Sequence, residues 1–276
     1  MPTPTWSSVA PALARQLADA RRQAHHAAQF ATALGISFLP PSADDSHTTL
    51  EWREADRALV SQPVHSPSGE VRLAVRIPDL VLMLLRDEHT RHTFDLRGQT
   101  TGAATTWVRT KLNEAGLTGP SYSLDRHFEI RAHPVGSGAP YSADAQHLEQ
   151  LAGWFGNAAQ VLDAVRGDLD GSPVRCWPHH FDIATLLTVR DSASVGVGME
   201  PGDGYYDEPY FYVNASPQPS REALTASLEG GGQWHTHEWI GAVLPASRVS
   251  GRADEQEQQV RSFLHSAVKA CRLLVS

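Results

Sequence analysis

The sequence is poor in cysteine, in long apolar runs and in positive charge. Its 276 residues contain two cysteines, Cys176 and Cys271, which excludes a disulfide scaffold or a cysteine-rich zinc module. The longest apolar run, Leu80 to Leu85, is far shorter than the roughly 18 residues of a membrane-crossing helix. The net charge is −8, whereas a nucleic-acid-binding protein normally has a basic surplus. We therefore expect neither a membrane nor a nucleic-acid partner.

The first twelve residues also lack the basic and then apolar pattern of a secretion signal, because Pro, Thr, Ser and Ala dominate them. Apolar residues make up 41% of the chain and charged residues 20%, which is enough for a substantial core. The composition indicates a soluble, cytoplasmic, globular protein. The unusual feature of the composition is its 14 histidines.

Four segments have apolar residues at helical spacing. The first has Pro11 near its start and Gly35 just past its end, where these residues often begin and end helices. Its two central histidines, His25 and His26, are expected at the surface. The four predicted helices cover Val9–Leu34, Ala103–Ala115, Ser142–Arg166 and Asp254–Val275.

Strand patterns occur in two groups, before and after the central helices. The segment Arg86–Gly102 between them is polar and is expected to be an exposed connection. No glycine-rich phosphate loop follows a strand, so a nucleotide-binding α/β fold is not expected. The predicted strands cover Thr48–Trp52, Arg57–Val64, Val71–Ile77, Leu80–Leu85, Phe128–Ala132, Val174–Arg190, Val195–Met199, Pro209–Ala215 and Gln233–Leu244.

This order of elements predicts an α+β fold, with a largely antiparallel sheet covered by long helices. We expect a single domain over residues 1–276, or two packed halves at 1–140 and 141–276. No internal repeat is found in the sequence.

Two histidine runs lie within predicted strands of the last third. Side chains alternate between the two faces of a strand, so His180 and Asp182 share a face if the first run is extended. By the same rule His235 and His237 share a face in the second run. A bulge of one residue would bring in His179 or Glu238 instead. We expect His180, Asp182, His235 and His237 to converge in one site.

Three imidazoles and one carboxylate form a donor set that Zn, Fe or Mn accepts, and such a set suits a catalytic site more than a structural one. The sequence leaves two alternatives to a divalent metal site. The same residues could form a metal-free site for acid–base chemistry or ligand binding. They could also be purely structural histidines.

A tyrosine-rich segment, Gly198 to Tyr212, lies between the two histidine runs and is expected to form a pocket wall or lid. Tyrosine and tryptophan offer large apolar surfaces with a polar tip. Cys176 is expected to be a buried, inert thiol, and no Gly-x-Ser-x-Gly nucleophile motif occurs. The residues predicted to bind a small molecule are Trp177, His179, Tyr206, Tyr210, Trp234 and Glu238.

Three motifs stand out in the last 105 residues: the Ser172–Asp182 segment, the Glu208–Val213 segment after Gly202-Asp203, and Trp234-His235-Thr236 with Gly241–Pro245. Through these motifs the last 105 residues resemble a family of bacterial proteins that is grouped only as a domain of unknown function. The resemblance implies that the long helices and the sheet belong to one unit, and it implies no reaction.

The sequence thus predicts a His/Asp- and aromatic-lined pocket within residues 175–245. The first functional hypothesis is an enzyme that acts on a small molecule, with or without a metal. The second is a non-catalytic small-molecule-binding or stress-associated protein. The third is an interaction module without a pocket.

Overall fold

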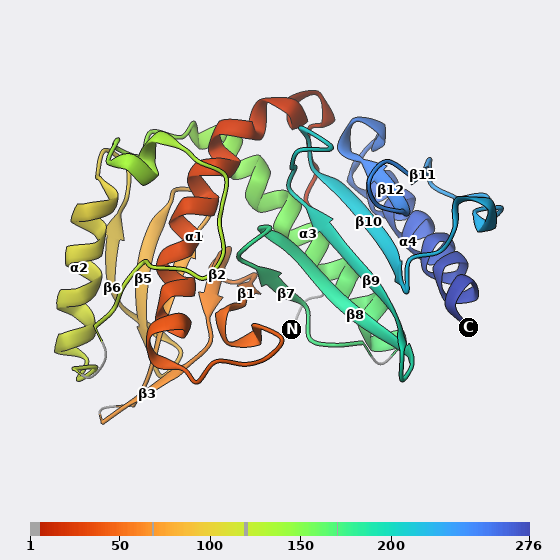
Figure 1. Cartoon of the computed structure of the whole chain (residues 1–276). Coiled ribbons are helices and arrows are strands. Elements are labelled where there is room, and N and C mark those ends of the chain that lie inside the picture. The colour runs from red at the N-terminus through yellow and green to blue at the C-terminus, as the bar shows by residue number, and fades with distance from the viewer. Residues whose placement is uncertain (1–5, 68, 119–120, 170) are drawn as a thin grey trace. The chain divides into compact units, whose positions relative to one another are not determined.

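The computed structural model describes residues 6–67, 69–118, 121–169 and 171–276 (Figure 1). The chain divides into two compact units. Unit 1 combines Met1–Ala18, Gly153–Arg175 and Asp182–Ser276. Unit 2 combines Asp19–Ala152 with Cys176–Phe181. The chain therefore passes between the units more than once, and each unit has its own strands and helices.

Unit 2 is built from helix α1, a set of antiparallel strands and helix α2. The strand order is β7-β1-β2-β4-β5-β6, and β3 pairs with β4. The elements are α1 (Ala18–Phe38), β1 (Leu50–Arg53), β2 (Ala58–Ser61), β3 (Val64–Ser66), β4 (Gly69–Arg76), β5 (Val81–Arg86), β6 (His89–Asp95), α2 (Thr101–Glu114) and β7 (Arg175–Trp177).

Unit 1 contains most of helix α3, five antiparallel strands in the order β11-β12-β10-β9-β8, and helix α4. Helix α4 packs against β9, β10 and β12, and it lies behind β10 in Figure 1. The elements are α3 (Ala145–Leu169), β8 (Asp182–Arg190), β9 (Ala193–Glu200), β10 (Tyr210–Ser216), β11 (Gln233–His235), β12 (Gly241–Pro245) and α4 (Ala253–Val275).

This architecture confirms the predicted α+β fold with antiparallel strands and long helices. The run Leu80–Leu85 was expected to be a buried strand, and β5 is buried at its first five positions. Among the helices of the described residues, none is long and apolar enough to cross a membrane. Five short 3-10 helices complete the described elements, at Pro11–Leu17, Ser46–Thr48, Pro134–Ser137, Arg221–Ala223 and Ala246–Arg248.

The ends of two helices differ from the sequence prediction. Helix α1 continues through Gly35 to Phe38, so this glycine does not end the helix. A β-carbon at Gly35 would lie 2.1 Å from the carbonyl oxygen of His47, so the glycine lets that backbone approach closely. Helix α3 begins at Ala145, and its first N–H groups donate to Asp144 rather than to Ser142.

One predicted connection and one predicted strand were wrong. The segment expected to be an exposed connection contains β6, which pairs with β5 although most of its side chains are exposed. A strand at the edge of a sheet is held by backbone hydrogen bonds and needs no apolar face, so its pattern gave no strand signal. Conversely, Phe128–Ala132 is not a strand; the Phe128 ring contacts the rings of His127 and His179, Ile130 is half-buried and Ala132 is exposed.

Candidate functional site

The first histidine run does not form the continuous strand that the alternation rule requires. Strand β7 ends at Trp177, and residues 178–181 form a turn closed by a 2.7 Å hydrogen bond from the Phe181 N–H to the Trp177 carbonyl. Phe181 has a φ of 74°, in the left-handed region. His180 and Asp182 are therefore separated by a turn, and the argument that placed them on one strand face was wrong.

The turn is held by a buried histidine that the sequence placed at the surface. The Nε2–H of His25 donates to the Pro178 carbonyl at 2.7 Å, and the His25 ring stacks on Phe181 with 4.8 Å between centroids. Burial lowers the pKa of His25 to about 3, so this histidine is neutral at pH 7. Its role is to position the turn between β7 and β8.

The second histidine run is also interrupted. Strand β11 ends at His235, residues 237–239 form a bend, and Glu238 has a φ of 67°. Strand β12 then returns antiparallel, with His235 opposite Gly241. The predicted strand Gln233–Leu244 is a hairpin, and His237 lies outside the strand that carries His235.

Both ring nitrogens of His235 have partners. The Nε2–H donates to the His237 carbonyl at 2.7 Å, because a carbonyl only accepts. This bond leaves Nδ1 as the acceptor, and the Tyr206 hydroxyl donates to it at 2.9 Å. The ring also stacks on Trp239 with 4.4 Å between centroids. Metal ligation by His235 would require the loss of one of these two hydrogen bonds.

Asp203 organises the tyrosine-rich segment. Its Oδ1 accepts from the backbone N–H groups of Tyr205 and Tyr206 at 2.7 and 2.9 Å. Its Oδ2 accepts from the Tyr210 hydroxyl at 2.8 Å. A short side chain that accepts backbone N–H groups two and three residues ahead stabilises a turn. This turn brings the Tyr206 and Tyr210 rings to 4.8 Å between centroids.

A second carboxylate–tyrosine pair lies across the strands β8, β9 and β10. Gly198 of β9 is opposite Ala184 of β8 and Tyr212 of β10. A β-carbon at Gly198 would lie 2.5 Å from the Tyr212 ring, so the glycine makes room for this ring over β9. Tyr212 thereby reaches β8, where its hydroxyl donates to Asp182 at 2.5 Å.

The tyrosines of this cluster remain protonated. Burial raises the pKa of Tyr210 and of Tyr212, and the negative charges of Glu200 and Asp182 respectively raise it further. Each hydroxyl is a hydrogen-bond donor to a carboxylate. The cluster is built to hold these carboxylates and strands in place, and its phenols are poor bases and poor nucleophiles.

The four predicted metal ligands belong to different units: His180 to unit 2, and Asp182, His235 and His237 to unit 1. Within the ranges that the structure describes, no three His, Cys, Asp or Glu side chains gather as a group that could hold a metal ion. The convergence of these four residues stays a prediction.

The predicted ligand-binding residues also divide between the units. Trp177 and His179 belong to unit 2, where their rings meet edge to face at 6.1 Å. In unit 1, the Trp234 Nε1–H donates to the Ala226 carbonyl, and Glu238 accepts from the exposed Tyr205 hydroxyl. The Tyr206 ring lies against the rings of both Tyr210 and His235, and Glu238 is connected to this aromatic group through Tyr205, whose ring meets His235.

Both cysteines are buried and form no disulfide. This finding confirms the expected burial of Cys176. Burial raises the pKa of Cys271 to about 12, so Cys271 remains a thiol at neutral pH.

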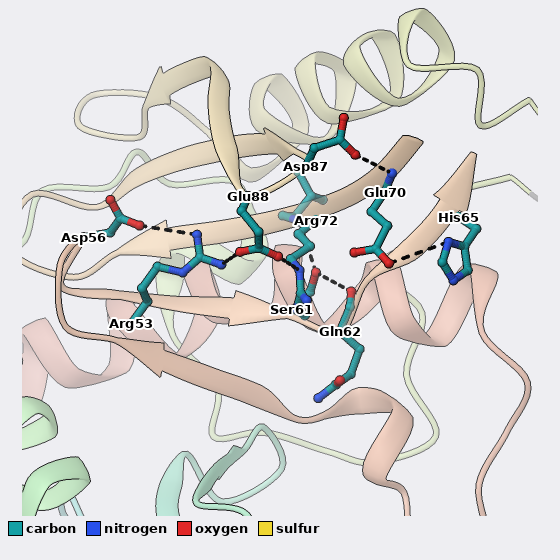
Figure 2. A network of polar contacts seen from close by, with 10 residues as sticks. Arg53, Asp56, Ser61, Gln62, His65, Glu70, Arg72, Asp87 and Glu88 are labelled. Atoms are coloured by element: carbon teal, nitrogen blue, oxygen red, sulfur yellow. Dashed lines mark hydrogen bonds and ion pairs between the residues drawn. The ribbon is translucent and has the colours of Figure 1, made fainter. Parts of the chain in front are cut away.

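A charged network in unit 2 was not anticipated from the sequence (Figure 2). Glu88, at the turn between β5 and β6, accepts from Arg53 of β1 and pairs with Arg72 of β4 at 2.9 Å. Arg72 also donates to the Ser61 carbonyl at 3.1 Å. Exposed ion pairs of this kind contribute little to stability. Their effect here is to join three strands through one glutamate.

A groove of about 650 Å³ lies in unit 1, between α3 and α4. None of its lining residues was predicted from the sequence to form a binding or catalytic site. Leu273, on its α4 side, is the most exposed large apolar side chain among the described residues, at 71%. The apolar lining consists mainly of Val161, Val165, Leu169, Leu264, Val268 and Leu273.

The groove has a basic rim. Arg261, His265, Lys269 and Arg272 all line it from α4. Arg261 pairs with Glu257 at 2.8 Å, whereas Lys269 and Arg272 form no ion pair within the described part of the chain. Because the whole chain has a net charge of −8, this cationic surface is a local feature.

The second described cavity is smaller, about 180 Å³, and lies in unit 2 between α2 and the segment that follows it. Its lining includes Arg109 and Tyr122. The Arg109 Nε–H donates to the Tyr122 carbonyl, and the Tyr122 hydroxyl donates to the Phe30 carbonyl. These bonds pin the segment to α1 and α2, so we assign this cavity a structural role.

No protein-family model, curated protein or solved structure matches the chain. The resemblance in its last 105 residues stays a prediction, and it carries none of the argument that follows.

Proposed function

We propose that this chain is a non-catalytic binding protein, and that the groove between α3 and α4 binds a ligand with an apolar body and negative charge. The observation that carries the proposal is the combination of an apolar groove of about 650 Å³ with a basic rim. Ligand sites are typically concave, mostly apolar and about 300–1,000 Å³ in volume, with a few charged groups that orient the ligand.

The aromatic and histidine cluster supports the non-catalytic part of the proposal. Tyr206 donates to His235, Tyr210 donates to Asp203, and Tyr212 donates to Asp182. Acid–base or nucleophilic chemistry needs a side chain that can take up or release a proton near neutral pH. The raised pKa values of Tyr210 and Tyr212 run against that requirement.

The exposed leucine at the groove supports the binding part. Leu273 lies at a groove that the partly exposed Val165 and Leu169 also line, so a ligand that covered these side chains would remove their remaining apolar surface from water. Burial of apolar surface is worth about 25 cal/mol per Å². A ligand with an apolar body gains this energy, and a negative group on it gains from Lys269 and Arg272.

The test uses the anionic apolar dye 8-anilinonaphthalene-1-sulfonate and the purified full chain. We expect saturable dye fluorescence, and we expect Leu273→Asp to weaken dye binding at least fivefold. Leu186→Asp is the matched control, because Leu186 is also an exposed leucine of unit 1, at 49%, and does not line the groove.

Near-UV circular dichroism must show that both variants keep the native packing, because the dye also binds molten states. Dye binding that does not saturate, or that both substitutions weaken equally in folded protein, would overturn the proposal.

A further inference from the structure

The basic residues at the groove form a row along α4. Arg261, His265, Lys269 and Arg272 are separated by four, four and three residues, which places them on one face of the helix. Eleven residues of helix separate the first from the last, a rise of about 16 Å at 1.5 Å per residue. The positive charge is therefore spread along the groove and is not gathered at one end.

The distribution of these charges distinguishes between kinds of ligand. A fatty acid or a similar amphiphile has its negative charge at one end, so it can pair with one of these cations. A ligand that pairs with several must present carboxylates at intervals along an apolar body. An α-helix with acidic residues beside an apolar stripe has this arrangement, because residues three and four apart lie on one face.

The apolar lining has a matching form. Val161, Val165 and Leu169 follow one another at four-residue steps on α3, and Leu264 and Val268 do so on α4. Val161, Leu264 and Val268 are buried, whereas Val165, Leu169 and Leu273 are partly or fully exposed. An apolar groove between two helices is the kind of surface into which a third helix packs its i, i+3, i+4 and i+7 residues.

We propose that the groove between α3 and α4 binds an acidic amphipathic α-helix of a protein partner, with the carboxylates of that helix against Lys269 and Arg272. This inference rests on the proposed binding function and names its ligand class. The partner helix adds a third helix to the pair that lines the groove.

A second copy of this chain is a poorer occupant. A two-fold symmetric contact places the same patch of both copies face to face. In such a contact the Lys269 and Arg272 side chains of one copy would meet those of the other across the groove. Like charges brought together in an interface oppose binding.

The test compares two designed 15-residue helical peptides that share one leucine stripe and differ in flanking residues, glutamate in one and lysine in the other. Binding to the full chain is measured by fluorescence anisotropy at low and high salt. We expect the glutamate peptide to bind at least tenfold more tightly than the lysine peptide, and the difference to shrink at high salt.

Two double variants complete the test. Lys269→Glu with Arg272→Glu is expected to reverse the preference between the peptides. Arg91→Glu with Arg97→Glu makes the same change in net charge at exposed positions of unit 2, and it is expected to leave the preference unchanged. Equal binding of both peptides, or a preference that the groove variant does not alter, would overturn the inference.

Two further measurements, binding of the dye alone and its displacement by dodecanoate, show whether the helical ligand or the binding function itself has failed. If dodecanoate displaces the dye and neither peptide does, the helical ligand is wrong and the binding function stands. If the dye itself does not bind, both fail. Association of the chain with itself that buries Leu273, detected by analytical ultracentrifugation of the native chain and the Leu273→Asp variant, overturns the partner helix in favour of a second copy.

Discussion

The two units have the same order of elements, but the side chains on their sheet faces differ. In each, a long helix is followed by antiparallel strands and then by another helix. One sheet face of unit 2 is an apolar cluster, whereas the equivalent strands β8, β9 and β10 of unit 1 present tyrosines, carboxylates and Gly198. The unit 2 cluster consists of Ala58, Val60, Ala74, Val81, Met83 and Leu85. One architecture therefore tolerates both an apolar and a hydrogen-bonded polar face.

The helices of the two units differ in how much of their surface is buried. Helix α1 is rich in alanine and is buried at most of its positions. Helix α4 buries one face, including Phe263 and Leu264, and exposes another that carries Lys269 and Leu273. Only a helix with an uncovered apolar edge can contribute to a docking groove. This difference is why we locate the binding function in unit 1.

The largest expected effect comes from removing α4. Deletion of residues 253–276 should give an insoluble or molten product, because α4 buries nine residues against the rest of unit 1, at about 1.5–3 kcal/mol for each large apolar side chain. For the five large apolar side chains among them this comes to about 7.5–15 kcal/mol, which is as large as the typical stability of a whole domain, about 5–15 kcal/mol. Solubility and near-UV circular dichroism measure the outcome.

Helix α2 of unit 2 serves for comparison with α4, through a single substitution in each helix. Helix α2 buries only Ala104, Val108 and Leu112. Val108→Ala should therefore leave a folded protein with reduced stability, whereas Phe263→Ala in α4 should cost about 3–5 kcal/mol. Equal losses in the two helices would contradict the difference we draw between the units.

A smaller loss is expected where a glycine makes room for a tyrosine. Gly198→Ala should lower the free energy of unfolding by about 1–3 kcal/mol, because its β-carbon would collide with the Tyr212 ring. Gly204→Ala is the matched control, since no atom lies within 4 Å of the β-carbon it would add. Urea unfolding of the two variants measures the difference, and similar midpoints would count against the assigned role of Gly198.

Unit 2 should become less stable in acid because of its buried histidine. The folded pKa of His25, about 3, lies below the ordinary value of 6.5, so the unfolded state binds a proton first as the pH falls. The contribution of His25 is complete above pH 6.5 and is lost progressively between about pH 6.5 and 3. Between pH 7.5 and 5 we expect a loss of about 2 kcal/mol from this residue.

The pH prediction is checked by urea unfolding of the native chain and of His25→Gln, whose side chain keeps an N–H donor and does not titrate. The variant should depend less on pH over this range. His237→Gln removes an exposed histidine and should keep the native pH dependence. A His25→Gln variant that loses stability in acid as steeply as the native chain would refute the prediction.

The last comparison removes one hydroxyl group at a time, and the smallest effect of all is expected at the exposed one. Tyr212→Phe removes the buried donor to Asp182 and should lower the free energy of unfolding by about 1–3 kcal/mol. Tyr205→Phe removes an equivalent bond to Glu238 from a residue that is 45% exposed, and it should have no measurable effect. Chemical denaturation compares the two, and an equal response would mean that burial of the tyrosine face does not matter.

Helical and strand periodicity was sufficient to predict the α+β fold and the positions of most long elements. The apolar stripe of α4 and the continuous apolar run of β5 are visible in the sequence, because burial of one face or both faces imposes a period on the residues. Gly35 was wrongly predicted to end its helix. This position requires glycine because the backbone of His47, from a segment farther along the chain, approaches it closely.

The site could be predicted only in part for the same reason. The pattern singled out Tyr206 and Tyr210 as ligand-binding residues and His235 as a metal ligand; the structure places Tyr206 against both of the others, and the predicted roles stay predictions. The turns at Phe181 and Glu238, where φ is positive, broke the alternation on which the other pairings depended. Such turns are stabilised by distant partners, as His25 stabilises the turn at Pro178, and no local pattern records them.

The sequence by itself determined most of the long helices and buried strands and their apolar faces, because these depend on neighbours three, four or two residues away. Only the tertiary structure decided that α3 and α4 leave a groove between them, and that Lys269 and Arg272 line it. A groove depends on the distance between two helices that lie about a hundred residues apart in the chain. That distance is set by how both pack within unit 1, and not by either helix alone.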